Sequence, residues 1–295
     1  MNLRKHAFQS TLTMLLATGV GIASPALSAD STAHEKSSGT LSSNIALASQ
    51  YVARGFQMTW GDPAVQGGFD YARPGGFFSG TWLSSISPKF IQDGYLEWDI
   101  YAGYGAAVGP VSLKSTLYYY LYPDAQIRGT GTASGNSVKY DYGELQLGAS
   151  WKWVTVNYWY TYTQDCFGYN GDTLFDSSGA FYRNGKHSRG SSYTEAILNY
   201  EIGNGYSALA RYGYQRIKNF EDWDSADYKI GFTKIFDSIL GSKGWSISVN
   251  YTGVTKANDY YRNKNTAVPF ASLTGDGSTS RPVDDQFIAA IARTF

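Results

Sequence analysis

The chain has 295 residues with 24 basic and 24 acidic side chains, a balance that excludes a basic nucleic-acid-binding domain and an acidic disordered tail. Charged residues make up only 16% of the chain, against roughly 25% in an average soluble domain, whereas tyrosine alone accounts for 25 residues. The single cysteine excludes a disulfide scaffold and a cysteine-based zinc site.

The start of the chain has the pattern of a secretory signal peptide. Two basic residues open it, an apolar stretch runs from Leu12 to Ala23, and mostly small residues then lead to Ala29. We therefore predict a signal peptide over residues 1–29. Cleavage after Ala26 is the alternative, because Leu27 is large for the position three residues before the cut. The apolar stretch is shorter than the roughly 20 residues of a membrane-spanning helix.

Beyond a serine-rich polar segment, residues 30–40, which we interpret as a flexible linker, apolar and polar residues alternate with a period of two. Trp245 to Thr252 is the clearest case, with large apolar or aromatic residues at odd positions and small polar residues at even ones. A helix would need a period of 3.6, so these segments are predicted strands of one domain over residues 41–295. Twelve are found, at about 43–55, 64–72, 77–86, 95–105, 111–122, 139–151, 153–163, 192–202, 206–216, 226–236, 245–255 and 285–295.

The connections between these segments alternate in length. The second, fourth, sixth and eighth have between one and five residues, whereas the fifth, seventh and eleventh are long, at about 123–138, 164–191 and 256–284. Such alternation is expected when short turns lie on one side of a membrane and long loops on the other. The pattern predicts an all-β protein, a twelve-stranded antiparallel transmembrane β-barrel with short periplasmic turns and long extracellular loops.

The last predicted strand supports an outer-membrane location. It ends the chain in Phe295, and Phe287, Ala289 and Ile291 share its face, although Arg293 interrupts that face. A terminal aromatic residue on an amphipathic strand resembles the assembly signal of bacterial outer-membrane barrels. A soluble barrel with an aromatic core is the alternative, because the alternation survives when a barrel is turned inside out.

Three short motifs rich in glycine and aromatic residues follow one another near the start of the alternating region: Tyr51-x-x-Arg54-Gly55, Pro63-x-x-Gln66-Gly67 and Gly76-Phe77-Phe78-x-Gly80-x-Trp82. With them, residues 43–87 resemble the amino-terminal part of the TorF-type porin family of proteobacteria. The resemblance implies an outer-membrane β-barrel with channel activity, and it implies no particular substrate.

Charged residues sort onto one face of the strands. When the face with the larger apolar residues is assigned to lipid, ten charged residues point inward: Arg54, Asp70, Glu97, Asp99, Lys114, Glu144, Glu195, Glu201, Arg211 and Lys229. On the lipid face near the midplane an Arg or Lys would cost about 2–4 kcal/mol. We predict that the ten residues line a pore with a weak preference for cations. In the alternative interpretation they pair into ladders that pack a narrow barrel.

Aromatic residues share this inward face. Tyr118, Tyr120 and Tyr122 lie on it in the fifth strand, and Trp153 and Trp159 lie on it in the seventh. Their rings are suited to stacking on a sugar or nucleoside ring, or to filling volume in the lumen.

An enzyme is not expected, and we predict no catalytic residue, metal site or cofactor. No inward strand position carries a histidine, and His187 lies in a long loop with Asp172 and Asp176. The loop carboxylates lack the twelve-residue spacing of a calcium loop. Cys166 is predicted to be a free thiol.

These observations predict an outer-membrane channel that lets small hydrophilic solutes or ions diffuse passively through a charge-lined lumen, narrowed by loop 164–191 or loop 256–284. The alternative is a structural or adhesive outer-membrane barrel with a plugged lumen and functional surface loops. The predicted partners are outer-membrane lipids and the solutes, without nucleic acid. A homo-oligomer is left open, by analogy with porin trimers.

Overall fold

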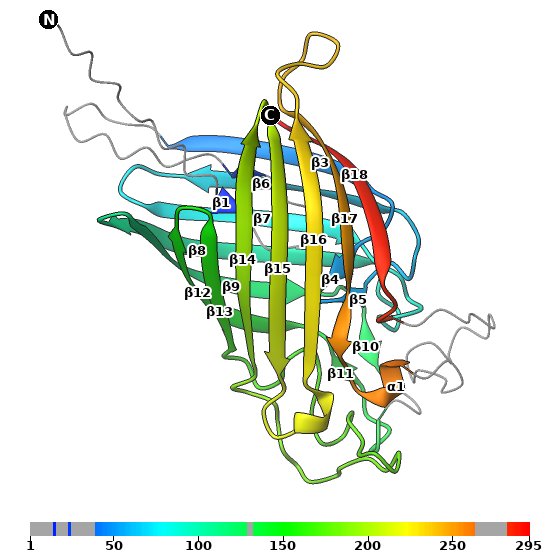
Figure 1. Cartoon of the computed structure of the whole chain (residues 1–295). Helices are drawn as coiled ribbons and strands as arrows, with labels where there is room; N and C mark the ends of the chain where they lie inside the picture. The colour runs from blue at the N-terminus through cyan, green and yellow to red at the C-terminus, as the bar shows by residue number, and fades with distance from the viewer. Residues whose placement is uncertain (1–13, 16–22, 25–38, 129–131, 263–281) are drawn as a thin grey trace, which may run out of the picture.

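The computed structural model describes residues 14–15, 23–24, 39–128, 132–262 and 282–295. Twelve strands in this part of the chain form a closed barrel in which neighbours are antiparallel (Figure 1), so the predicted twelve-stranded antiparallel barrel is confirmed. Its strands are β3 (Thr40–Ala48), β6 (Ala64–Ala72), β7 (Phe77–Ser85), β8 (Leu96–Val108), β9 (Val111–Leu121), β12 (Tyr142–Trp151), β13 (Val154–Thr161), β14 (Ser192–Gly203), β15 (Tyr206–Arg216), β16 (Ser225–Ile235), β17 (Trp245–Lys256) and β18 (Gln286–Thr294).

The barrel closes where the last strand pairs with the first. β18 lies antiparallel to β3, with Ala290 opposite Ala48 and Thr294 opposite Asn44, and the Phe295 N–H donates to the Ser43 carbonyl at 2.8 Å. Every barrel strand therefore has a partner on both sides. A closed sheet leaves no edge whose backbone groups lack hydrogen bonds.

Side chains alternate between the two surfaces of the sheet as predicted. Trp98, Ile247 and Val249 are exposed on the outer surface, whereas Glu97 and Asn250 are buried inside. Strand residues have a period of two, so this assignment extends around the barrel. Arg293, which interrupts the apolar outer face of β18, places its guanidinium carbon 4.3 Å from the ring centroid of Phe295 and 5.3 Å from that of Trp245.

Short and long connections lie at opposite ends of the barrel. The turns at 73–76, 109–110, 152–153, 204–205 and 236–244 define what we call the short-turn end, and the carboxyl terminus lies there too (Figure 1). Asn204 and Gly205 both have positive φ values, 52° and 76°, as a tight two-residue hairpin of type I′ requires. The longer connections, including loop 162–191, lie at the other end, called the loop end here.

The first predicted strand was too long, and this is the main correction to the predicted elements. β3 ends at Ala48, and the chain turns into the barrel as a small hairpin of β4 (Val52–Ala53) and β5 (Phe56–Gln57). Arg54 and Gly55 form its tip with positive φ values of 46° and 85°, a conformation that ends an extended strand.

Other short elements lie outside the barrel wall. A second hairpin pairs β10 (Gln126–Ile127) with β11 (Val138–Lys139), so the predicted strand at 139–151 starts later, at Tyr142. The 3-10 helix η2 (Glu221–Trp223) and helix α1 (Asp259–Arg262) lie in loops. No helix among the described residues is both long and apolar enough to cross a membrane.

The predicted signal peptide and linker lie almost entirely outside the described residues and stay predictions. Within 1–38 the structure describes only β1 (Met14–Leu15) and β2 (Ala23–Ser24), which pair antiparallel.

Gly55 generates a first test, because its backbone conformation and its surroundings both favour glycine. A Cβ there would lie 2.5 Å from Val254 Cγ2 and 2.9 Å from Asp227 Cβ, whereas a Cβ on Gly75, whose φ is 95°, would meet nothing within 4 Å. Gly55→Ala should therefore lower the free energy of unfolding more than Gly75→Ala does, by about 1–3 kcal/mol of overpacking. Urea unfolding of the refolded barrel measures both values, and equal losses would contradict the close approach.

Candidate functional site

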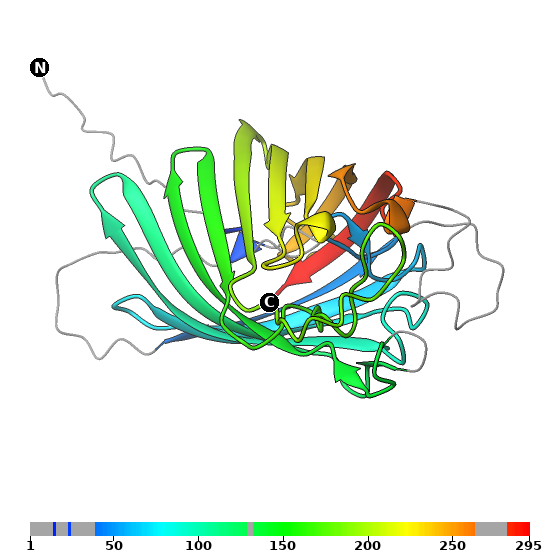
Figure 2. The same cartoon turned by 90° about the horizontal axis from the view of Figure 1, so that it is seen from below.

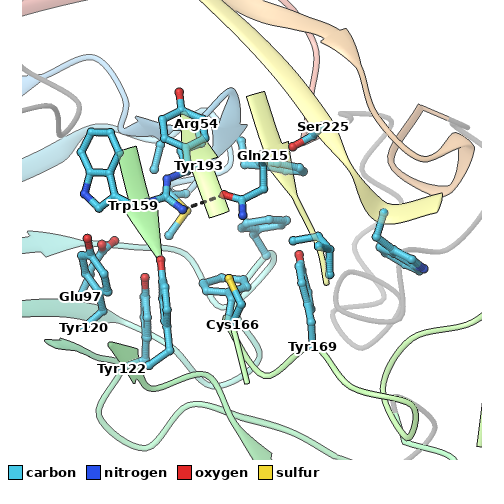
Figure 3. Close-up of a pocket in the computed structure, with 18 of the residues that line it drawn as sticks. Arg54, Glu97, Tyr120, Tyr122, Trp159, Cys166, Tyr169, Tyr193, Gln215 and Ser225 are labelled. Atoms are coloured by element: carbon cyan, nitrogen blue, oxygen red, sulfur yellow. Dashed lines mark hydrogen bonds between the residues drawn. The ribbon is translucent and has the colours of Figure 1, made fainter. Parts of the chain in front are cut away.

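A cavity of about 1060 Å³ lies inside the barrel, and part of it is open to solvent. Its walls come from the β4–β5 hairpin, from the inner faces of β8, β9 and β12 to β15, and from the loops that follow β13, β15 and β17. Figure 2 looks at the loop end, where the connection between β13 and β14 lies across the ring of strands. Figure 3 shows the side chains that line the cavity.

Arg54 joins the hairpin to the opposite wall. Its Nη1 donates to Gln215 Oε1 at 2.7 Å (Figure 3). The same Nη1 donates to Glu144 Oε1 at 3.1 Å, and Nη2 donates to Glu144 Oε2 at 2.5 Å. The guanidinium carbon also lies 4.4 Å from the ring centroid of Tyr193 and 5.7 Å from that of Trp159. A bidentate ion pair stacked on aromatic rings is a geometry that arginine forms and lysine does not.

A second ionic cluster spans β13 to β16. Arg211 pairs with Asp227 and lies 3.6 Å from Glu195 Oε2. The Tyr193 hydroxyl donates to Asp227 Oδ1 at 2.7 Å, and Asn157 Nδ2 donates to Glu195 Oε1 at 2.9 Å. These charges are held between neighbouring strands, which is the ladder arrangement that was the alternative interpretation of the inward charges.

Another part of the cavity wall, formed by β8, β9 and β12, carries a row of tyrosine rings. The centroid distances are 5.4 Å from Tyr101 to Tyr118, 5.7 Å from Tyr118 to Tyr120 and 4.6 Å from Tyr120 to Tyr142. The planes of Tyr118 and Tyr120 differ by only 2°. Tyrosines spaced two apart on β9 place their rings on the same face of the sheet, and β8 and β12 extend the row across three strands.

Two buried carboxylates lie beside this tyrosine wall without a cation. Glu97 Oε1 accepts a hydrogen bond from the Tyr51 hydroxyl at 3.3 Å. Glu97 Oε2 and Asp99 Oδ1 are buried and have no hydrogen-bond partner in the described part of the chain. A buried carboxylate without its full set of partners is costly, and neither Glu97 nor Asp99 forms an ion pair among the described residues.

The structure brings most of the ten predicted pore-lining residues into the barrel interior. Glu97, Asp99, Glu144, Glu195 and Lys229 are buried there, and the Arg211 side chain is 8% exposed. Their part in permeation stays a prediction.

Three of the ten lie nearer the short-turn end, and one is not on a strand. Asp70 accepts a hydrogen bond from the Tyr101 hydroxyl at 2.5 Å, and Lys114 Nζ is 5.8 Å from the ring centroid of Phe78. Glu201 is exposed near the end of β14. Arg54 faces the lumen, but it does so from the hairpin tip and not from the first strand as predicted.

Sequence reasoning missed several partners of these groups. Asp227 shares the inward parity of Lys229 on β16, which was a signal, but it lies at the edge of the predicted segment. Gln215 and Tyr193 are uncharged, so sorting by charge did not select them. Trp153 was placed wrongly: β13 begins at Val154, and Trp153 lies in the preceding turn with 48% of its surface exposed.

Loop 162–191 folds toward the cavity, as predicted. Cys166, Phe167 and Tyr169 line the cavity, and Leu174 is fully buried. Ser188 Oγ ties the loop together by donating to the Tyr169 carbonyl at 2.5 Å and accepting from the Cys166 N–H at 2.8 Å. The loop after β17 also reaches the cavity through Tyr261, although residues 263–281 of the predicted loop 256–284 lie outside the described residues.

His187 lies at the exposed edge of the same loop. Its Nδ1 is 2.8 Å from Asp165 Oδ1, and its Nε2 is 2.7 Å from Gln164 Nε2. Across the described ranges, no three His, Cys, Asp or Glu side chains are grouped so that they could hold a metal ion.

The fold and its lumen define the class as a closed twelve-stranded β-barrel with a polar, aromatic-lined interior. The chain belongs to a family described as bacterial protein of unknown function (Gcw_chp), whose profile matches residues 32–295. No curated protein matches the chain.

Several solved barrels are similar to this chain in shape. The NanC porin has a TM-score of 0.46 at 8% identity, with 87% of this chain and 99% of that chain covered. The KdgM porin has a TM-score of 0.44 at 9% identity, and the match covers 86% of this chain and 99% of that porin. OccK5 of Pseudomonas aeruginosa has a TM-score of 0.37 at 14% identity, and the match covers 85% of this chain and 62% of that protein. The chemistry of the lumen is therefore argued from its own residues.

The Arg54–Glu144 pair can be tested by a double-mutant cycle with Arg54→Ala and Glu144→Gln. Each single substitution removes one partner and leaves the charge of the other partner unpaired inside the barrel. The coupling free energy between the two substitutions should therefore be about 2 kcal/mol or more. The exposed pair Arg128–Asp93 has the same 2.5 Å separation with both side chains 48% exposed, and it should give about 0–1 kcal/mol. Urea unfolding measures both cycles, and equal coupling would contradict the role of Arg54 as the anchor of the hairpin.

Cys166 reports on the packing of loop 162–191. Burial raises the pKa of its thiol to about 12, so at pH 8 the thiolate, which is the reactive form, is scarce. A maleimide should label the native barrel far more slowly than the urea-unfolded chain. Ser177→Cys in a Cys166→Ser background places a thiol on the exposed part of the loop as a control and should label at the same rate in both states. Rapid labelling of native Cys166 would show that the loop does not cover the cavity.

Proposed function

We propose that the protein is a bacterial outer-membrane channel through which small hydrophilic solutes or ions diffuse passively. The observation that carries the proposal is the inversion of the two surfaces of the barrel. Large apolar side chains are exposed on the outside of all twelve strands, whereas Glu97, Asp99, Glu144, Glu195 and Asp227 are buried inside. Soluble monomers rarely expose contiguous apolar surface of this extent, whereas a lipid bilayer requires it.

Two features of the sequence support the location. Residues 1–29 have the pattern of a signal peptide, and residues 43–87 resemble the TorF-type porins. The short-turn end would then face the periplasm and the loop end the outside. Outer-membrane lipids are the proposed partners of the outer surface, and a homo-oligomer is compatible with the same arrangement.

The proposed path narrows at the loop end. Glu201 is exposed near the short-turn end, whereas Tyr51, Met58 and Phe90 are buried and line the cavity. The narrowing comes from the β4–β5 hairpin and from loop 162–191, and the hairpin is anchored by Arg54. Solute passage would depend on movement of these segments, while the strand walls stay fixed.

The inward hairpin is also the observation that favours a second candidate, a structural or adhesive barrel with a plugged lumen. The unsatisfied oxygens of Glu97 and Asp99 favour the channel, because carboxylates that only pack a plug would be expected to have their hydrogen bonds satisfied.

Single-channel recording in planar bilayers tests the proposal. The purified mature chain should give stepwise currents with weak cation preference, because the lumen holds seven acids, with Asp227 added to the predicted six, against four bases. Arg54→Ala combined with Arg211→Ala should raise conductance and shift the reversal potential further toward cations, because both cations leave the lumen and the hairpin loses its anchor.

Arg216→Ala is the matched control, since Arg216 is exposed at the other face of β15. It should leave the reversal potential unchanged. Electrical silence of a barrel that is folded, as judged by a heat-modifiable gel band, would refute the channel and support the plugged barrel.

A further inference from the structure

The cavity has two sides with similar chemistry, and only one of them contains a cation. On the first side, the Arg54 guanidinium pairs with Glu144 and lies over the rings of Tyr193 and Trp159. This arrangement combines a carboxylate with aromatic faces, and a positive group held between them is stabilised by both.

The second side of the cavity also combines a buried carboxylate with aromatic rings, but it has no cation in the described part of the chain. Glu97 is 3% exposed and lines the cavity, and its Oε2 has no hydrogen-bond partner among the described residues. Asp99, the next inward residue of β8, is 1% exposed, and its Oδ1 is likewise without a partner. None of the ion pairs found in the described ranges involves either residue.

The rings of the second side belong to Tyr118, Tyr120 and Tyr142, which also line the cavity. Tyr120 lies between the other two, with its centroid 5.7 Å from Tyr118 and 4.6 Å from Tyr142. Figure 3 shows Glu97, Tyr120 and Tyr122 together on one side of the cavity, apart from Arg54 and Gln215. The negative faces of such rings attract an ammonium ion.

We propose that this side of the cavity binds a small organic cation whose ammonium group is held by Glu97 and packs against the tyrosine rings. The inference rests on the proposed channel, because the ligand reaches the cavity through the lumen. A neutral sugar would stack on the same rings but would leave two adjacent buried carboxylates uncompensated. A metal ion would require a larger group of ligating side chains than the described residues place together.

Isothermal titration of choline into the purified full-length mature barrel in a non-ionic detergent tests this site. The matched neutral ligand is 3,3-dimethylbutan-1-ol, which has the shape of choline without its charge. Choline should bind and the neutral alcohol should not. Glu97→Gln should weaken choline binding about tenfold or more, the loss expected for a charge-assisted contact in a buried site.

Two further comparisons separate a binding role from a structural one. Glu201→Gln makes the same chemical change at the exposed end of β14 and should leave choline affinity unchanged. Tyr120→Phe keeps an aromatic ring and should keep binding, whereas Tyr120→Leu should reduce it. A heat-modifiable gel band verifies that each variant is folded.

The opposite results would overturn the inference. The first is the absence of binding heat when choline is added at millimolar concentration. The second is that the neutral alcohol, or glucose as a neutral sugar, binds as tightly as choline. The third is that Glu97→Gln leaves the affinity for choline unchanged. Titration needs no current, so its failure is distinct from failure of the channel. A barrel that binds choline but conducts nothing would refute the channel alone.

Discussion

A sheet of twelve strands that closes on itself encloses more space than its own side chains can fill, and the rest of this structure follows from that geometry. Barrels of eight strands have an interior just wide enough for their side chains, and wider ones leave a lumen. Here the remaining space near the loop end is occupied by connecting segments, namely the β4–β5 hairpin and loop 162–191. The wall is a regular hydrogen-bonded sheet, and in the proposed channel the irregular segments inside it would determine which solutes can pass.

Filling a polar lumen with loops requires that the loops have polar contacts with the wall. Arg54 meets this requirement at the hairpin tip, where it reaches Glu144 on β12 and Gln215 on β15. Gly55 makes the tip possible, since a side chain there would overlap Val254 and Asp227. The motif Tyr51-x-x-Arg54-Gly55 therefore has a physical explanation in this fold as a turn that carries one cation into the barrel.

The wall of this barrel could be predicted from the sequence, whereas the contents of its lumen could not. A period of two is a local property of each strand, so the strand positions and the direction of residues such as Glu97 and Val249 followed from neighbouring residues alone. The position of Arg54 depends on partners 90 and 161 residues away along the chain, and nothing near residue 54 specifies them. Trp153 was wrongly assigned to the inward face for a related reason. The alternating pattern of the sequence continues through Trp153, but in the structure this residue lies in a turn, where side chains do not alternate between the two faces of a sheet.

The two ends of the lumen also differ in how their charges are stabilised. Asp70, Lys114 and Glu201 lie toward the short-turn end, where Glu201 is exposed to water and needs no protein partner. Near the hairpin, the charged side chains are buried, and a buried charge is costly unless a partner compensates it. Arg54 and Arg211 meet this need for Glu144, Asp227 and Glu195, and no third cation is paired with Glu97 and Asp99 among the described residues. Tyr51, which begins the segment of the β4–β5 hairpin, donates a hydrogen bond to Glu97 and lines the same cavity. In the proposed channel, the hairpin and the unpaired carboxylates therefore lie close together, and a permeating cation would be stabilised there.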